Sequence, residues 1–590
     1  MKTSSRLGRR KRWYDADNAS PHASVFDIVP QLESKSSDRR NKFLKHARLY
    51  GNYEFGGLGP GQNSVSGRSN RLTFNVVANC VDTATALMAR SKPAPQFLTS
   101  GADYKLARKA IKLNKFGKGV QHQLGIHRLS ESMHLDKLIY GTCFAKIWSE
   151  GKKLCAERVF PWEILVDEAD GFYGDPKNMF QVKYIDRDRL IDMYPEREDK
   201  LWHTPSAPTG YFGEQLTTDL IKVVECWHLS GKSGRHVICV ENDTLFDEEW
   251  TRTRFPIVWS HWDLPRPTGF WGGSMVERLA PIQASISDLI ARIKQKTRLF
   301  GVPRIIVDAA SGIPKNWISN EIGEILTIQN GANPPVILTP PPLANEDMQL
   351  LQMEIARAYE EVGISQASAT ARKPTGINSG VGVREVLEIG SERLVMYGLR
   401  WEEFHMDVVR VALDEVREID GFSVDVPGKQ HRDELSWADL DLDEEAYVLQ
   451  CFPVSLLPQT PAGRYERIQE LAMGGWITKE QGLELMQVPD MDNLSADVNA
   501  QSNSVRQRID GMIDDGVYVA PEPYDDPAAS IAIVKSIYFQ ERERGAPEQT
   551  LAMLRQYMTT CATIMSRAQV QNQAMQQQPT PGAGPQPPTQ

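Results

Sequence analysis

One long helical pattern near the middle of the chain constrains the fold more than any other feature. Apolar and aromatic residues recur there in steps of three and four, the spacing that places side chains on one face of an α-helix: Val383, Leu387, Leu394, Tyr397, Trp401, Phe404, Val408, Val411 and Ile419. At 1.5 Å per residue this helix is about 55 Å long, which is too long for one compact core. We therefore expect it to serve an assembly.

A small, polar segment rich in glycine, Gly363–Gly382, precedes the long helix and follows a shorter helical pattern at residues 346–362. A segment of this composition is typical of a loop held out from a scaffold. It contains one basic pair, Arg372 and Lys373. Taken alone, this pair has no chemistry beyond that of an ordinary charged surface.

The composition limits the classes of protein that the chain can belong to. Its 590 residues are 41% hydrophobic and 24% charged, which is typical of soluble globular proteins with several domains. The basic segment Met1–Asn18 lacks the apolar core of a signal peptide, so we expect a protein that stays in the cytoplasm where it is made. A net charge of −9 argues against coating nucleic acid with the whole surface but allows a local basic ring. The seven scattered cysteines indicate free thiols.

The periodicity along the chain predicts a fold of the α+β class. Helical spacing predicts helices in these ranges: 37–50, 75–89, 104–139, 274–300 and 346–362. A small mixed sheet is predicted between Thr142 and Trp262 from short apolar runs: 143–148, 164–166, 221–229, 236–240 and 257–259. A compact strand-rich insert follows at 302–342.

Beyond Gly421 the pattern changes again. We expect a strand at 422–426, an acidic loop at 433–445, a strand at 447–449, and then short helices between Arg464 and Arg567. The final Gln- and Pro-rich segment, 571–590, should be disordered, because it has almost no apolar content. The last turns of the helix at 274–300 are basic, which complements the dipole of a helix C-terminus: Arg292, Lys294, Lys296 and Arg298.

Motifs that would indicate an enzyme are incomplete. Gly231-Lys232-Ser233 lacks the leading glycine of a phosphate-binding loop, and Gly272-Gly273-Ser274 lacks the second flanking glycine of a nucleophile elbow. We therefore predict no catalytic residue and no cofactor.

One predicted hairpin carries four residues of the types that bind zinc, Cys226, His228, His236 and Cys239. If Leu229 lies opposite Arg235, the first three share a face of the sheet and Cys239 falls on the other, so four ligands do not converge. We predict ordinary strand residues and no metal. His127 and His134 share a helix face, but no carboxylate is placed to complete a site.

The helices around the polar loop are rich in acidic residues, among them Glu354, Glu385, Glu402 and Asp414. In a monomer they indicate a solvated helix face, laced with arginines. Repeated around a ring, the same faces would line a negatively charged lumen. The sequence leaves both interpretations open.

Several short segments, in this order, resemble the portal (head-to-tail connector) proteins of tailed double-stranded DNA bacteriophages, with a short-tailed phage as the expected source. These segments are Asn75–Thr83 with Lys92–Pro95, Leu138–Lys146, Arg158–Trp162 with Val166-Asp167, Phe270–Ser274 with Leu279–Gln283, and Ala356–Tyr359. The resemblance covers roughly residues 40 to 455.

The resemblance implies a portal-like subunit divided into segments. They are a basic N-terminal arm and flexible loop (1–72), a wing of helices and mixed sheet (73–273), a stem helix (274–302), a clip (303–342), a second stem helix (343–362), a tunnel loop (363–382), a long wing helix with wing strands (383–455), a helical crown (456–570) and a disordered tail (571–590).

The resemblance also implies which residues meet a partner. The tunnel loop would face DNA through Arg372, Lys373, Thr375 and Asn378. Its hinges would be glycines, which adopt backbone angles closed to other residues: Gly363, Gly376, Gly380 and Gly382. Lys315 and Trp317 would be the clip contacts.

The function implied is a non-enzymatic ring, a dodecamer, at a capsid vertex of the virion. Double-stranded DNA would be packaged and ejected through it. Its partners would be the terminase large subunit, then the tail adaptor protein, together with the major capsid and scaffolding proteins. Two alternatives from other classes stay open: a phage-associated nuclease or ATPase subunit using carboxylates for magnesium, and a capsid or tail scaffold without a channel.

Overall fold

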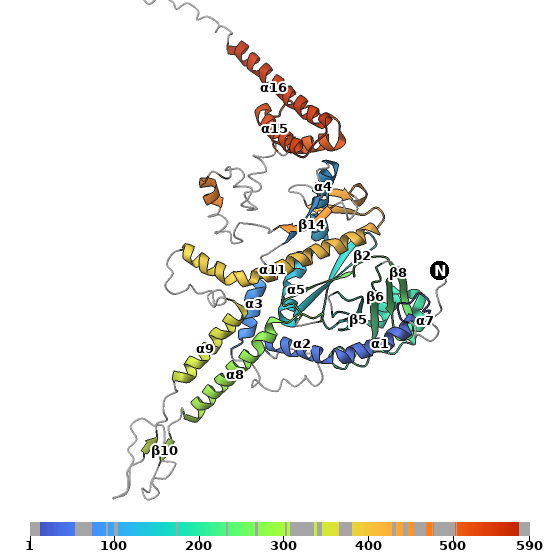
Figure 1. Ribbon diagram of the computed structural model, residues 1–590, viewed down its shortest axis with the longest axis vertical. Helices are drawn as coiled ribbons and strands as arrows, with labels where there is room; N and C mark the ends of the chain where they lie inside the picture. Colours follow the sequence, from blue (N-terminus) through green and yellow to red (C-terminus); the bar gives the residue numbers. More distant parts are fainter. Residues whose placement is uncertain are drawn as a thin grey trace, which may run out of the picture. The chain divides into compact units, whose positions relative to one another are not determined.

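The protein is described here from a computed structural model, shown in Figure 1. The structure describes residues 12–52, 74–89, 93–99, 104–172, 175–231, 234–265, 269–300, 304–306, 336–338, 345–364, 380–427, 432–440, 447–452, 468–474, 476, 502 and 504–576. Helices and strands are both abundant, which confirms the α+β class. The chain forms two compact units, the first from Met1–Lys92 and Val120–Asp420, the second from Pro93–Gly119 and Gly421–Gln590.

The two larger sheets of the first unit are antiparallel. One has the strand order β3 (Lys153–Val159), β2 (Thr142–Glu150), β9 (Ile257–His261). The other has the order β4 (Ile164–Leu165), β5 (Asn178–Asp186), β6 (Leu220–His228), β7 (Gly234–Cys239), β8 (Thr244–Trp250). Every described strand pair is antiparallel, so the expectation of a mixed sheet was wrong. The pairs β2–β3, β6–β7 and β7–β8 are antiparallel because short turns cannot make parallel crossovers.

One face of the five-stranded sheet is covered by α1 (Pro21–Lys35), a helix that the sequence did not predict. Val25, Val29 and Leu32 pack there against inward side chains of β5, β6 and β7. These three positions have helical spacing. Two further short helices, α6 (Arg187–Met193) and α7 (Glu198–Trp202), were also missed.

The helical core of the first unit joins five helices in one apolar cluster. They are α2 (Ser37–Tyr50), α3 (Val76–Ala89), α5 (Ile126–Tyr140), α8 (Met275–Phe300) and α9 (Asn345–Val362). The helical region expected at 104–139 is broken in two, because Gly125 has a φ of 60° and ends α4 (Tyr104–Leu124) before α5 begins.

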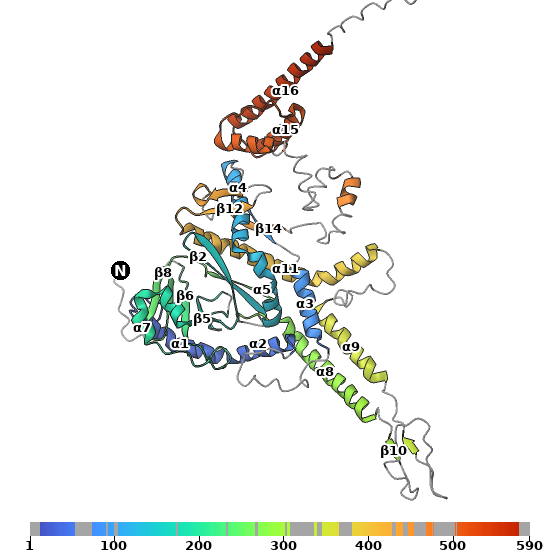
Figure 2. The ribbon, with the colours of Figure 1, turned by 180° about the vertical axis from the view of Figure 1, so that it is seen from behind.

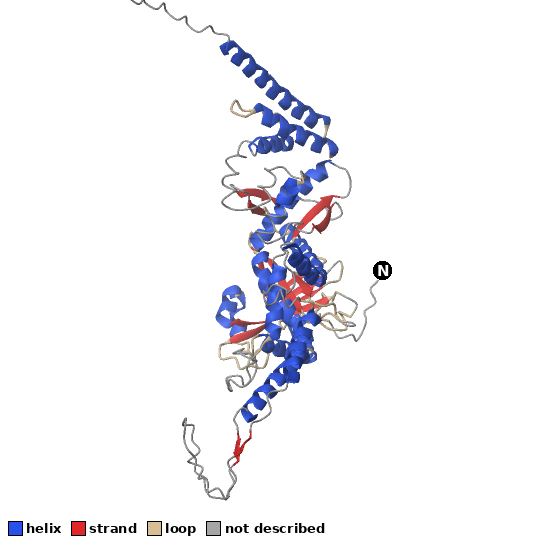
Figure 3. Ribbon diagram, turned by 90° about the vertical axis from the view of Figure 1, so that its left-hand side faces the viewer, coloured by secondary structure: helices blue, strands red, loops and turns tan. Residues whose placement is uncertain are grey.

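Helices α8 and α9 form an antiparallel pair, drawn side by side from both directions in Figures 1 and 2. The start of α8 and the end of α9 lie in the apolar cluster, through residues such as Leu279 and Tyr359. The far ends lie outside it. In Figure 3 the pair continues into two short strands, β10 (Arg304–Ile306) and β11 (Val336–Leu338), which pair antiparallel.

The predicted long helix is confirmed as α11 (Gly380–Arg417), a single helix of 38 residues. It begins before the predicted start, so Gly380 and Gly382 are helical rather than part of a loop, and it ends before Ile419. Its second half packs along β2 and β9 through Trp401, Phe404 and Val408, which are buried.

The second unit contains two small strand pairs and a helical module. Strand β1 (Ala94–Thr99) pairs with β14 (Tyr447–Phe452), and β12 (Ser423–Pro427) pairs with β13 (Arg432–Ser436). The acidic loop expected at 433–445 therefore begins inside a strand. Residues 504–515, α15 (Pro527–Glu543) and α16 (Glu548–Gln576) share an apolar core. Since α16 is helical to Gln576, the expected disorder from residue 571 was wrong for its first six residues.

Candidate functional site

The outer end of the α8–α9 pair carries the predicted basic residues. Arg292, Lys294 and Lys296 are exposed on α8. The ammonium nitrogen of Lys296 lies 2.5 Å from a carboxylate oxygen of Asp347 in the first turn of α9. This ion pair ties the two helices together where the apolar cluster no longer reaches them. Arg298 lies in the last turn of α8, and its side chain is outside the described part.

Large apolar side chains are exposed on α9 and α11. Met353 is 62% exposed and Met396 is 60% exposed, and Met348, Leu350 and Leu399 share this property. An amphipathic helix normally buries such residues, so these faces lack a cover within the described part of one chain.

The polar loop begins where the sequence predicted. Gly363 ends α9 with a φ of 70°, a conformation that favours glycine. Most of the predicted contact residues lie outside the described part of the chain: Arg372, Lys373, Thr375, Gly376 and Asn378 of the loop, and Lys315 and Trp317 of the insert. Their roles stay predictions.

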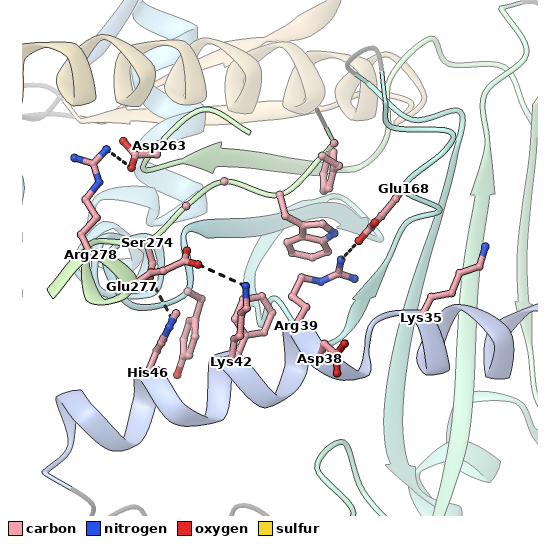
Figure 4. A pocket seen from close by; sticks show the side chains of 17 residues that line it. Lys35, Asp38, Arg39, Lys42, His46, Glu168, Asp263, Ser274, Glu277 and Arg278 are labelled. Atoms are coloured by element: carbon pink, nitrogen blue, oxygen red, sulfur yellow. Dashed lines mark hydrogen bonds and ion pairs between the residues drawn. The ribbon is translucent and has the colours of Figure 1, made fainter. Parts of the chain in front are cut away.

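A cleft of about 770 Å³ lies at the start of α8, between α2 and the segment that precedes α8 (Figure 4). Its cations face carboxylates. A guanidinium nitrogen of Arg39 lies 2.9 Å from a carboxylate oxygen of Glu168, and a guanidinium nitrogen of Arg278 lies 2.5 Å from a carboxylate oxygen of Asp263. Lys42 is 3.6 Å from Glu277. Because these charges cancel in pairs, the cleft has no excess of positive charge that would attract a phosphate.

One serine and one histidine meet in this cleft, but they do not form an activated nucleophile. The hydroxyl oxygen of Ser274 lies 3.3 Å from Nδ1 of His46. The same Nδ1 lies 3.2 Å from the carbonyl oxygen of Ile139, to which it can only donate. The hydroxyl oxygen of Ser274 accepts the backbone N–H of Glu277 at 3.0 Å. Ser274 therefore caps the first turn of α8.

The hairpin with the candidate zinc ligands does not have the predicted pairing of Leu229 with Arg235. His228 pairs with Arg235, and Trp227 pairs with His236. As a result Cys226 and Cys239 share the buried face that α1 covers, and His236 lies on the other. In the described part of the chain, no three histidine, cysteine or acidic residues are grouped to hold a metal ion.

No pattern in the sequence indicated the polar network on that other face. Glu225 of β6 lies between the ammonium of Lys146 and Nε2 of His236, the latter at 3.0 Å. Burial opposes the charge of Glu225, but the two cations outweigh it and lower its pKa to about 2. The network lines a groove of about 850 Å³ between the sheets. Its charges are satisfied within the protein.

No family model matches the chain, and no curated protein matches its sequence. None of the described helices combines the length and the apolar content that a membrane span requires.

Proposed function

We propose that this protein is a bacteriophage portal subunit, which assembles into a ring that conducts double-stranded DNA. One observation supports this most: an antiparallel helix pair, α8 and α9, is rooted in an apolar core at one end and carries a strand pair at the other. The chain then crosses a polar loop into the 38-residue helix α11. This order of elements is the one that the sequence resemblance implies.

The exposed apolar side chains favour an assembly over a monomer. Met348, Met353 and Met396 lie on α9 and α11, which bury side chains in the unit only toward the C-terminal end of each helix, from Ala358 and from Trp401 onward in the described part. Packing copies of the same chain side by side would remove these side chains from water, at about 25 cal/mol per Å² of apolar surface. When each copy uses two different faces, the copies form a ring if the rotation between neighbours closes.

A ring would give the polar loop a function that one chain lacks. Arg372 and Lys373 would be repeated in every copy, and the repeated pair would form a belt of positive charge. Such a belt attracts phosphates without reading the base sequence. DNA could therefore move past it and still be retained. In a dodecamer the insert between α8 and α9 would meet the terminase large subunit and later the tail adaptor protein.

The loop can be tested in the phage that encodes the protein. Replacing Arg372→Ala together with Lys373→Ala should leave ring assembly intact but reduce the DNA that is packaged or retained. A matched control is Lys152→Ala with Lys153→Ala, an exposed basic pair in which Lys152 lies in the turn after β2 and Lys153 is the first residue of β3. If the loop variant yields as many DNA-filled capsids as the unmodified protein, Arg372 and Lys373 do not have this role.

A further inference from the structure

A cluster of basic side chains is completely buried between α5 and α11. His134 and Lys137 belong to α5, and His405 belongs to α11. All three residues are 0% exposed. Basic residues are rarely buried to this extent unless they are paired with an acid or a hydrogen-bond acceptor.

The three side chains surround the indole ring of Trp401. The imidazole ring of His134 lies 4.1 Å from this ring, and the ring of His405 lies 5.1 Å from it. The ammonium nitrogen of Lys137 lies 4.9 Å from the same ring centre. The contact between α5 and α11 therefore includes one aromatic ring and three bases, and His127 of α5 stacks on His405 at 5.4 Å between ring centres.

None of these bases has a hydrogen-bond partner in the described part of the chain. Both ring nitrogens of His134, both ring nitrogens of His405 and the ammonium nitrogen of Lys137 are buried without one. Burial of an unpaired charge costs far more than burial of the neutral group. The histidines are therefore stable in this position only when they are neutral.

In the described part of the chain, no carboxylate is among the groups that act on His134, Lys137 or His405. The ionisable groups acting on the cluster are His127 of α5, Cys143 of β2 and Arg400 of α11, and Lys137 in turn acts on His261 of β9. Of the two acids in α5, Glu131 is exposed, and Asp136 binds two nitrogens of Arg158, each at 2.5 Å.

Burial lowers the pKa of His134 far below its ordinary value, and the neighbouring bases lower it further. Burial likewise lowers the pKa of His405 to about 3 and that of Lys137 to about 8.

We propose that the contact between α5 and α11 is an acid-sensitive joint. Proton uptake by His134 and His405 would place positive charges beside Lys137 in a buried site with no counter-ion. The second half of α11 would then separate from α5, because the charged rings gain water only when the two helices part. This joint does not depend on ring formation.

The sign of the pH dependence follows from the two states. Above a pH of about 6.5 the histidines are neutral in both the closed and the open joint. Below it, the two histidines bind protons only in the open joint, so their titration favours opening, by up to tenfold per pH unit for each histidine. Lys137 gains its proton at a higher pH in both states and adds no change between pH 7 and pH 5.

Hydrogen exchange of the full chain measures this opening. Peptides from α5 and from residues 396–417 should lose protection between pH 6.5 and pH 5.5, with an opening constant that rises roughly 30-fold after correction for the chemical exchange rate. The helix α15, which contains no histidine, is the internal reference. Equal protection of α11 at the two pH values would overturn the proposal.

Variants separate the two histidines from general acid damage. His134→Leu with His405→Leu should remove most of the acid dependence, and His203→Gln, at an exposed histidine after α7, should keep it. If the double variant does not fold, Lys137→Met is the second test. It should lower the opening constant by roughly tenfold or more at pH 7 while acid dependence remains. Acid dependence that persists in the double variant, or greater opening in Lys137→Met, would contradict the joint.

Discussion

A Cβ atom built on Gly141 would lie 2.2 Å from the carbonyl oxygen of Gly272, so the chain after α5 touches the chain before α8 backbone to backbone. Gly141 has a φ of 90° and ends α5, where its N–H donates a hydrogen bond to the backbone carbonyl oxygen of Lys137 at 3.0 Å. This contact fixes where α8 leaves the core, because it leaves room for no side chain.

Gly141→Ala should destabilise the first unit by more than backbone strain alone explains. A positive φ costs a non-glycine residue about 1–2 kcal/mol, and the clash with Gly272 should add about 1–3 kcal/mol. The matched control is Gly151→Ala, which has a φ of 61° but nothing within 4 Å of the added atom. Chemical unfolding of both variants measures the difference. Equal losses of unfolding free energy in the two variants would mean that the backbone near Gly272 can move away from the added methyl group at no energetic cost.

Arg252 ties the end of α11 to the segment between β8 and β9. Its guanidinium bonds to Glu415, which is buried, and to Glu418, whose oxygen accepts from Nε at 2.9 Å. Arg252→Met should therefore lower the free energy of unfolding by about 3–5 kcal/mol, since Glu415 would stay buried without its counter-ion. Adding Glu415→Met should recover a large part of the loss. Additive losses in the double variant would show that the two side chains are not coupled.

Glu225 should make stability depend on acid in a defined range. Its pKa is lowered to about 2, so the folded protein binds fewer protons than the unfolded chain below a pH of about 4.5. The stabilisation is complete above that pH and is lost as the pH falls toward 2. Glu225→Gln should cost up to about 3 kcal/mol at pH 7 and almost nothing near pH 2. Glu249→Gln, at an exposed position of β8, is the control. A cost that does not change with pH would contradict this account.

Helices with a strong apolar stripe could be located from the sequence, and strands with a charged face could not. The helix at 37–50 was predicted with its correct ends, because Phe43, Leu44 and Ala47 repeat at helical spacing. Strand β8 was missed, since Asp247, Glu248 and Glu249 interrupt its apolar pattern. Those side chains can be charged because β8 is the edge of its sheet.

Strand register and contacts between distant segments account for the other differences between the predictions and the structure. The hairpin between β6 and β7 shifts by one residue from the assumed pairing, and a shift of one residue moves every side chain to the other face. The cluster of His134, Lys137 and His405 could not be predicted, because the residues lie on helices far apart in the sequence. The basic end of α8 could be predicted, since its cations lie in the last turns of a helix with a clear apolar pattern.

Electron microscopy of the purified full-length protein tests the central proposal most directly. The account predicts closed rings with a central channel, and a particle mass that corresponds to twelve copies if the implied dodecamer is correct. Particles that stay monomeric, or assemble without a channel under conditions in which the protein is folded, would contradict it.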